Sequence, residues 1–419
     1  MENLALNTFF KIFFVFSEHL IRGLEHITSD HGGVLMEATK PRIGVFFCDC
    51  GETVGNLIDF TSLEEHARNI EGVEYVGTDR FMCSTETTGQ MYRITKERKL
   101  DRMVIGACSP RVYGEEFKQA AQDAGINPYM VEIANLREQV AWMHSTDVKE
   151  ATEKAKDAIS MAVARSKQLR PLTRPPTAFV IEGRCSGCGI CASTCRRGAI
   201  VFKEDPWTGK RVAQVDPAEC LACGACVAAC PSGALDMEGF SNAEILAEID
   251  AFSDGLLDSK EPFPSILVFA CNWCSYPAAD FAGLKRMQME PKFRIIRTPC
   301  SARVDPEWIL RALSRGVDGV LVLGGKEGYC HYEGGNIKTK TRMALLSKVL
   351  RQVGYDADRF HVDWVNSDEP GLFRDIVNDF IERIETLGPN PVRAPSDEER
   401  PTSALFHGRD DYEHPSYRR

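Results

Sequence analysis

The chain has 419 residues, which is enough for two or three domains with buried cores. Apolar residues make up 43% and charged residues 26% of the sequence, which excludes wholesale disorder, and a formal net charge of -10 argues against binding to nucleic acid or to an anionic membrane surface. The unusual feature is a count of 16 cysteines. A disulfide-rich secreted scaffold would be short and would follow an export signal, so we interpret the thiols as metal ligands kept reduced in a cytoplasm.

Residues 1–40 precede the first regular pattern and contain an aromatic cluster at 9–16. Lys11 and Glu18 bound a short apolar run, whereas a spanning helix needs about 20 apolar residues. A basic region before the cluster and a small-residue cleavage site after it are both missing, so the segment lacks the pattern of a secretory signal. We expect a dispensable extension without a membrane span; the alternatives are a helix that docks on a partner and a membrane role.

From residue 41 onward, short apolar runs alternate with amphipathic segments, which predicts a parallel α/β sheet. We expect this first domain to cover residues 41–168. Its predicted strands are 43–47, 73–76, 102–105 and 128–133, and its predicted helices are 62–70, 85–96, 113–124 and 148–168. Three prolines within residues 169–176 then predict a linker.

After a cysteine-rich module at residues 177–240, the α/β pattern returns over residues 262–388. Its predicted strands are 265–269, 294–296, 319–323 and 361–365, and its predicted helices are 280–289, 306–314, 339–353 and 371–387. Residues 389–419 are polar and rich in proline and charged side chains, which predicts a flexible tail.

The cysteine-rich module carries two four-cysteine runs of the same spacing, C-x2-C-x2-C-x3-C. Two copies of this run are the signature of a bacterial-type ferredoxin with two 4Fe-4S clusters, in which the fourth cysteine of each run ligates the other cluster. Zinc ribbons also use paired C-x2-C elements but fit this double run poorly. The expected ligand sets are Cys185, Cys188, Cys191 and Cys230 for one cluster, and Cys220, Cys223, Cys226 and Cys195 for the other. The predicted fold class is therefore α/β, with two parallel-sheet α/β cluster domains flanking a small α+β bacterial-type ferredoxin domain.

The other eight cysteines divide equally between the flanking domains, and in each domain they follow the ends of three predicted strands. Because the carboxyl ends of parallel strands lie on one edge of a sheet, four thiols from three loops can converge there on one metal centre. A single buried cysteine is common in any core, but two sets with the same placement favour metal binding. Zinc and iron–sulfur clusters both accept four thiolates, so the residues alone leave that choice open. The two sets are Cys48, Cys50, Cys83 and Cys108, and Cys271, Cys274, Cys300 and Cys330.

The first domain resembles the amino-terminal domain of the A-type subunits of heterodisulfide reductase. The motifs that carry this resemblance are CDCG at 48–51, CS at 83–84, ACSP at 107–110 and NLREQ at 135–139. The resemblance implies a 4Fe-4S cluster on Cys48, Cys50, Cys83 and Cys108. In that family a flavin-binding domain follows the long helix. Here only the proline linker separates the helix from the ferredoxin, and no G-x-G-x-x-G opens a βα unit, so FAD is not expected in this chain.

The last domain resembles the delta subunit of methyl-viologen-reducing hydrogenase. Its matching motifs are FACNWC at 269–274, TPCS at 298–301, GYCHY at 328–332 and GN at 335–336. The resemblance implies a 2Fe-2S cluster on Cys271, Cys274, Cys300 and Cys330. That family usually has a further cysteine where Gly325 stands here. Two neighbours of the cysteines have alternative interpretations: Trp273 shields the cluster or simply packs, and His331 is a loop residue beside the site or a ligand of a mixed centre.

These patterns predict an electron-transfer subunit of an oxidoreductase complex, with three 4Fe-4S clusters and one 2Fe-2S cluster, no catalytic residues and no independent substrate site. By resemblance, the partners would be a flavin-containing subunit, other heterodisulfide-reductase-like subunits, and a subunit of the hydrogenase or formate dehydrogenase type, in the cytoplasm of an anaerobe. Because the last domain is far in sequence from the ferredoxin, we expect it to form one end of the electron path. The alternatives are a flavoenzyme with an unrecognised FAD site and a cysteine-rich zinc-binding assembly protein.

Overall fold

The computed structural model describes residues 40–204, 209–257 and 263–393. The expected extension before Lys40 and the tail beyond Arg393 lie outside these residues. None of the helices in the described ranges has the length and apolar character needed to cross a bilayer.

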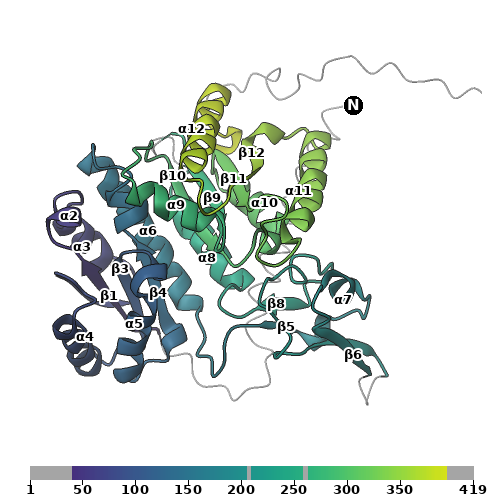
Figure 1. Cartoon of the computed structure of the whole chain (residues 1–419), viewed down its shortest axis with the longest axis horizontal. Helices are drawn as coiled ribbons and strands as arrows, with labels where there is room; N and C mark the ends of the chain where they lie inside the picture. The colour runs from purple at the N-terminus through teal and green to yellow at the C-terminus, as the bar shows by residue number, and fades with distance from the viewer. Residues whose placement is uncertain (1–39, 205–208, 258–262, 394–419) are drawn as a thin grey trace, which may run out of the picture. The chain divides into compact units, whose positions relative to one another are not determined.

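The first α/β domain is built on a four-stranded parallel sheet in the order β2-β1-β3-β4. Its strands are β1 (Ile43–Cys48), β2 (Val73–Asp79), β3 (Arg102–Ala107) and β4 (Val131–Asn135), and its helices are α2 (Glu52–Gly55), α3 (Phe60–Arg68), α4 (Thr85–Arg98), α5 (Pro110–Asp123) and α6 (Val148–Gln168). Side chains alternate along β1, so Val45 and Phe47 pack with α3 and α6, whereas Phe46 and Cys48 pack with α4 and α5. Both faces of this buried sheet are therefore covered (Figure 1).

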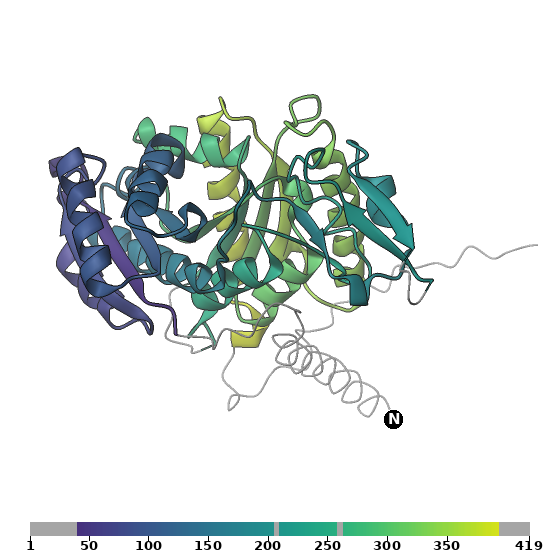
Figure 2. The same ribbon diagram turned by 90° about the horizontal axis from the view of Figure 1, so that it is seen from below.

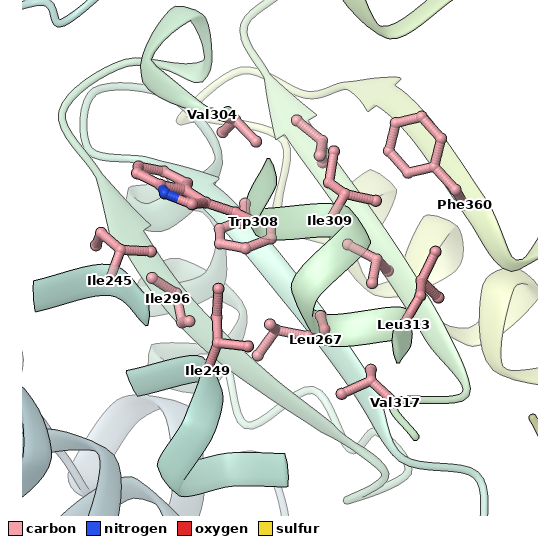
Figure 3. Close-up of a cluster of buried hydrophobic side chains, with 14 of the residues drawn as sticks. Ile245, Ile249, Leu267, Ile296, Val304, Trp308, Ile309, Leu313, Val317 and Phe360 are labelled. Atoms are coloured by element: carbon pink, nitrogen blue, oxygen red, sulfur yellow. The ribbon is translucent and has the colours of Figure 1, made fainter. Parts of the chain in front are cut away.

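The last domain repeats the same strand order, β10-β9-β11-β12, in a second parallel sheet. Its strands are β9 (Ile266–Cys271), β10 (Phe293–Thr298), β11 (Gly319–Gly324) and β12 (Phe360–Trp364), and its helices are α8 (Asn242–Ser253), α9 (Ser275–Leu284), α10 (Pro306–Ser314), α11 (Gly335–Gln352) and α12 (Pro370–Leu387). One face of the sheet packs on α8, α10 and α11 around the fully buried Trp308 (Figure 3). The other face packs on α9 and α12.

The cysteine-rich module folds as two small antiparallel sheets, β5-β8 and β6-β7. Its elements are β5 (Ala178–Val180), α7 (Ile190–Thr194), β6 (Ile200–Glu204), β7 (Arg211–Val215) and β8 (Leu235–Met237). The predicted fold class, two parallel α/β domains flanking a small α+β module, is confirmed.

Several features differ from the sequence-based expectation, and the strand expected at 128–133 begins only at Val131. The helix expected at 280–289 begins at Ser275, directly after Cys274. Helix α8 and the π-helical turn η3 (Arg137–Ala141) were not expected, because neither has a strong helical periodicity. The last domain also extends past the expected boundary at residue 389, since Asn390 donates its backbone N–H to Asp318 and Arg393 pairs with the same buried carboxylate.

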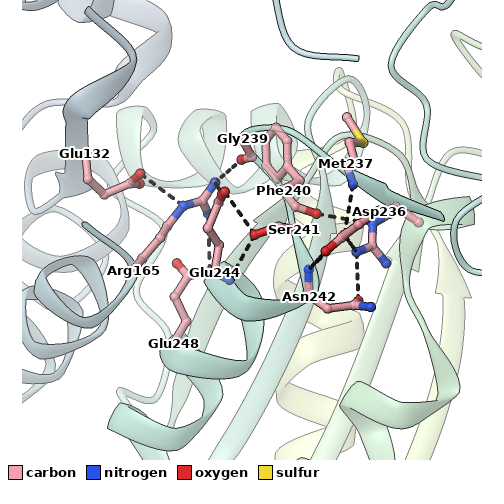
Figure 4. Close-up of polar contacts among 11 residues, drawn as sticks. Glu132, Arg165, Asp236, Met237, Gly239, Phe240, Ser241, Asn242, Glu244 and Glu248 are labelled. Carbon is pink, nitrogen blue, oxygen red and sulfur yellow. Dashed lines mark hydrogen bonds and ion pairs between the residues drawn. The ribbon is translucent and has the colours of Figure 1, made fainter. Parts of the chain in front are cut away.

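A buried ion-pair network joins α6 of the first domain to α8 (Figure 4). The guanidinium of Arg165, on α6, pairs with Glu132 from β4 at 3.1 Å and with Glu248 from α8 at 3.3 Å. Glu244 lies one turn away on α8, 3.6 Å from the same guanidinium. Helices α6 and α8 run side by side in both views (Figures 1 and 2).

A second contact between the two α/β domains is made by backbone. Helix α9 packs on η3 so closely that a methyl group added at Gly283 would overlap the carbonyl group of Glu138. Asp280, one turn earlier on α9, accepts hydrogen bonds from the side chains of Ser109, Asn135 and Gln139. Glycine is thus required at position 283 for close helix approach.

We expect Gly283→Ala to destabilise the protein by about 1–3 kcal/mol, because the new methyl group forces α9 away from η3. The matched control is Gly89→Ala within α4, where an added methyl group meets no atom within 4 Å. That change should be neutral or stabilising by up to about 1 kcal/mol, since alanine is the better helix former. Denaturant midpoints of both variants measure the difference, and equal midpoints would refute the close-packing argument.

The stability of the chain should also depend on pH through Glu248. Burial raises the pKa of Glu248 to about 8, although Arg165 opposes that shift. A carboxyl group whose pKa is higher in the folded than in the unfolded state contributes stability at low pH, which is lost as the pH rises through about 8. Glu248→Gln should therefore remove up to roughly 1.4 kcal/mol per pH unit of this slope. Urea unfolding at pH 6 and pH 8, with the exposed Glu115→Gln as control, tests it; an unchanged slope in Glu248→Gln contradicts the assignment.

Candidate metal centres

The eight cysteines of the flanking domains lie at the carboxyl edges of the two parallel sheets. In the first domain, Cys48 ends β1, Cys83 follows β2 and Cys108 follows β3. In both sheets the chain moves from the first strand to one neighbour and then crosses to the other. The loops after these three strands therefore open around the topological switch point, which is where open α/β sheets bind ligands.

The four thiols of the first domain form one group. The sulfur of Cys48 interacts electrostatically with those of Cys50 and Cys83, and the sulfur of Cys108 with those of Cys48 and Cys83. Burial raises the pKa of Cys48 and raises that of Cys108 to about 12. The backbone N–H of Met82 points at the Cys48 sulfur from 3.4 Å.

Arg137 supplies the positive charge beside this group. Its guanidinium lies 3.7 Å from the Cys50 sulfur, stacks on the Trp142 ring at 4.8 Å and pairs with Glu138 at 2.6 Å. Although burial opposes the charged form, Glu138 and Cys50 raise the pKa of Arg137, which keeps it cationic. The guanidinium therefore places a fixed positive charge beside the Cys50 sulfur.

In the ferredoxin module the thiols fall into two groups, each drawn from both runs. Cys191 has Cys230, Cys185 and Cys188 as its sulfur neighbours, and we call these four the first ferredoxin set. The neighbours of Cys223 are Cys195 and Cys220, and Cys226 adjoins all three of them; these four are the second ferredoxin set. This is the crossed grouping that the spacing predicts; ligation of the clusters themselves stays a prediction.

The four thiols of the last domain are the most tightly packed, and we call them the C-terminal set. The side chain of Cys271 lies beside those of Cys274 and Cys300, and the side chain of Cys300 lies beside that of Cys330. The close pairing lowers the pKa of Cys330 to about 5 and raises that of Cys300. Cys271, Cys274 and Cys300 are each at most 4% exposed.

Two glycines make room for the C-terminal set. A Cβ atom at Gly335 would lie 2.5 Å from the Cys300 sulfur, and one at Gly325 would lie 2.5 Å from the Cys274 sulfur. The His331 ring stacks on Trp273, with 3.8 Å between their centroids, instead of joining the thiols. Position 325 thus abuts the site even though its residue carries no ligand.

Four thiolates are the donor set of iron–sulfur clusters and also of structural zinc sites. Within the described ranges, no three His, Cys, Asp or Glu side chains converge closely enough to hold one metal ion. In a 4Fe-4S cluster each thiolate binds a different iron atom, so the sulfurs stand further apart than around a single ion. Burial raises the pKa of Cys108 and Cys226 and so favours their protonated thiol forms. A metal centre bound at these sulfurs would displace the thiol protons.

Sequence reasoning missed the groups that connect the sites. Arg111, three residues after Cys108, donates to the backbone carbonyl of Asn272, which follows Cys271. On the other side, Ala225, Cys300 and Ala302 form a buried apolar cluster that also contacts Cys223. The C-terminal set therefore adjoins the ferredoxin directly, and the loop after Cys271 contacts the first domain. Only the motif positions next to the cysteines could have signalled these contacts.

Comparison with known families and proteins identifies relatives of separate parts of the chain. The family described as "Methyl-viologen-reducing hydrogenase, delta subunit" matches residues 266–388, and the family "4Fe-4S dicluster domain" matches residues 184–234. The chain is similar to the D-type iron–sulfur subunit of the F420-non-reducing hydrogenase of Archaeoglobus profundus, with 43% identity over 131 residues, which cover 31% of this chain and 96% of that relative.

The N-terminal part is similar to the A-type subunits of heterodisulfide reductases. That of the ferredoxin:CoB-CoM heterodisulfide reductase of Methanosarcina mazei is 40% identical over 215 residues, which cover 51% of this chain and 26% of that relative. That of the H(2):CoB-CoM heterodisulfide,ferredoxin reductase of Methanothermobacter thermautotrophicus is 34% identical over 184 residues, which cover 42% of this chain and 28% of that relative. The chain thus spans about a quarter of the length of these relatives.

We expect Gly335→Ala to perturb the C-terminal set selectively, because the new methyl group displaces the Cys300 sulfur. The matched control is Gly371→Ala in the first turn of α12, where an added methyl group meets no atom within 4 Å. Iron and acid-labile sulfide, measured after anaerobic purification, should fall in Gly335→Ala only. If Gly335→Ala kept the iron and sulfide contents of the wild type, Cys300 would not be a ligand of the metal centre.

Proposed function

Because the chain belongs, through residues 266–388, to the family of methyl-viologen-reducing hydrogenase delta subunits, we propose that it is an iron–sulfur electron-transfer subunit of a heterodisulfide-reductase-like oxidoreductase complex. The observation that carries this proposal is the grouping of all 16 cysteines into four sets of four thiols. Similarity of the N-terminal part to the heterodisulfide reductase relatives supports the type of complex.

In this proposal each thiol set holds one cluster. The set of Cys48, Cys50, Cys83 and Cys108 holds a 4Fe-4S cluster, and the two ferredoxin sets hold one 4Fe-4S cluster each. The C-terminal set holds a 2Fe-2S cluster. Iron–sulfur clusters accept and release single electrons, so the chain needs no substrate pocket of its own.

The contribution of the protein is to stabilise negative charge at the sulfurs. Backbone N–H groups of Met82, Ala213 and Ala234 point at Cys48, Cys185 and Cys230 from 3.3–3.4 Å. Hydrogen bonds to ligating sulfurs raise a cluster's reduction potential, because the reduced cluster carries more negative charge. The positive charge of Arg137 beside Cys50 would likewise raise the reduction potential of a cluster bound there.

The partners follow from the same reasoning. A polypeptide that only relays electrons requires a donor and an acceptor. The similarity to the hydrogenase relative supports a partner of the hydrogenase type, and the similarity to the heterodisulfide reductase relatives supports other subunits of such a complex. The proposal adds a formate dehydrogenase-type subunit as the alternative to the hydrogenase, and a flavin-containing subunit as the partner at the other end of the relay. We place the relay in the cytoplasm of an anaerobe, where the thiols stay reduced.

The anaerobically purified chain should contain about 14 iron atoms, from three 4Fe-4S clusters and one 2Fe-2S cluster. Iron, acid-labile sulfide, zinc and flavin are measured on the same sample. About 8 iron atoms would remove the flanking clusters. Zinc without sulfide would favour a zinc-binding assembly protein, and a flavin spectrum would favour a flavoenzyme. Proteins that co-purify under anaerobic conditions identify the donor and acceptor.

A further inference from the structure

The C-terminal set and the second ferredoxin set meet at one small buried cluster, which we call the wall between them. Cys300 lies in a buried apolar cluster with Ala225 and Ala302, and Cys223 and Cys330 pack against it. Helix α11 holds the two modules at this wall: Lys338 donates to the Thr194 carbonyl, and Arg342 donates to the Ala302 carbonyl at 2.9 Å while reaching the Ala225 carbonyl at 3.5 Å. Among the described residues, those of the first ferredoxin set take no part in this cluster.

Tyr332 is the side chain that fills this wall. It packs against the same apolar cluster as Cys223 and Cys330. The hydroxyl accepts a hydrogen bond from the indole N–H of Trp273 at 2.9 Å. Trp273 in turn stacks on His331, which stands edge-on to Tyr332 with 4.9 Å between ring centroids. The rings of Trp273, His331 and Tyr332 thus pack together beside the wall.

A small cavity lies among the thiols of the second ferredoxin set. Its volume is about 50 Å³, and its lining includes Tyr332 and all four thiols of the set, Cys195, Cys220, Cys223 and Cys226, so it is the space in which the proposed cluster would sit. Removal of the Tyr332 ring would extend this cavity toward Cys300. Water that enters would then reach both thiol sets at once.

We propose that Tyr332 is a positioning residue: its ring excludes water from the wall between the C-terminal set and the second ferredoxin set, and it thereby sets the reduction potentials of the centres bound at both. The proposal rests on the proposed function, because it requires clusters on these thiols. Solvent stabilises the additional negative charge of a reduced cluster, so a wetter wall shifts the potential upward.

The experiment is a redox titration of the full-length, anaerobically purified chain, followed by electron paramagnetic resonance. Tyr332→Ala should shift two of the four midpoint potentials upward and leave the other two unchanged. Tyr332→Phe keeps the ring and should titrate like the wild type. The control is Tyr329→Ala, which removes a 71% exposed ring from the same loop and should shift nothing.

Unchanged potentials in Tyr332→Ala overturn the proposal, and so does an equal shift in Tyr332→Phe or in Tyr329→Ala. Iron content is measured in each sample. If Tyr332→Ala loses iron, the titration is repeated with Tyr332→Leu, whose side chain is apolar and bulkier than alanine but smaller than the ring. The same two midpoint potentials should then shift upward. If Tyr332→Leu also loses iron, Tyr332 is a structural residue and the positioning role is overturned. Absence of iron in the wild type defeats the proposed function, whereas normal iron with unchanged potentials defeats only this inference.

Discussion

The guanidinium of Arg165 is the buried charge on which the packing of all three modules depends. It belongs to the first domain, pairs with Glu132 and Glu248, and donates to the carbonyl of Gly239 at the end of the ferredoxin module at 2.6 Å. Burying an unpaired cation would cost several kcal/mol, so each module supplies part of the compensation. Burial, with a smaller contribution from the neighbouring carboxyl group of Glu132, raises the pKa of Glu244 to about 7, although Arg165 opposes that shift.

A second guanidinium, from the last domain, binds the chain next to Gly239. Arg303 is fully buried, bonds the Phe240 carbonyl at 3.2 Å and the Asn242 amide oxygen at 2.8 Å, and packs against Gly224 of the ferredoxin. Arg165 and Arg303 therefore fix the chain between β8 and α8 by its backbone. The carbonyls of Gly239 and Phe240 in this segment bind the two buried cations that orient the ferredoxin.

Much of the fold could be predicted because the two α/β domains follow strong rules. Continuous apolar runs indicated the strands, and the rule that parallel strands end at one edge grouped the flanking cysteines. Helix α8 was not predicted because its inward face includes Glu244 and Glu248, polar residues that break the apolar stripe. Gln139 and Ser109 lie in motifs interpreted as markers of a cluster domain, but their side chains bind Asp280 of the last domain. A sequence pattern marks such residues without revealing which module they contact.

The order of the sites in space differs from their order in the chain. The distance in sequence between the last domain and the ferredoxin suggested that the last domain forms an end of the electron path. Instead its thiols adjoin Cys223 on one side, while the loop after Cys271 receives Arg111 of the first domain on the other. The last domain thus contacts both other modules close to its thiols, and Trp273 in the same loop is 40% exposed. Sequence separation limits only how far the connecting chain can reach. A domain at one end of the chain can therefore pack against both other modules when buried charges such as Arg165 and Arg303 hold the modules in contact.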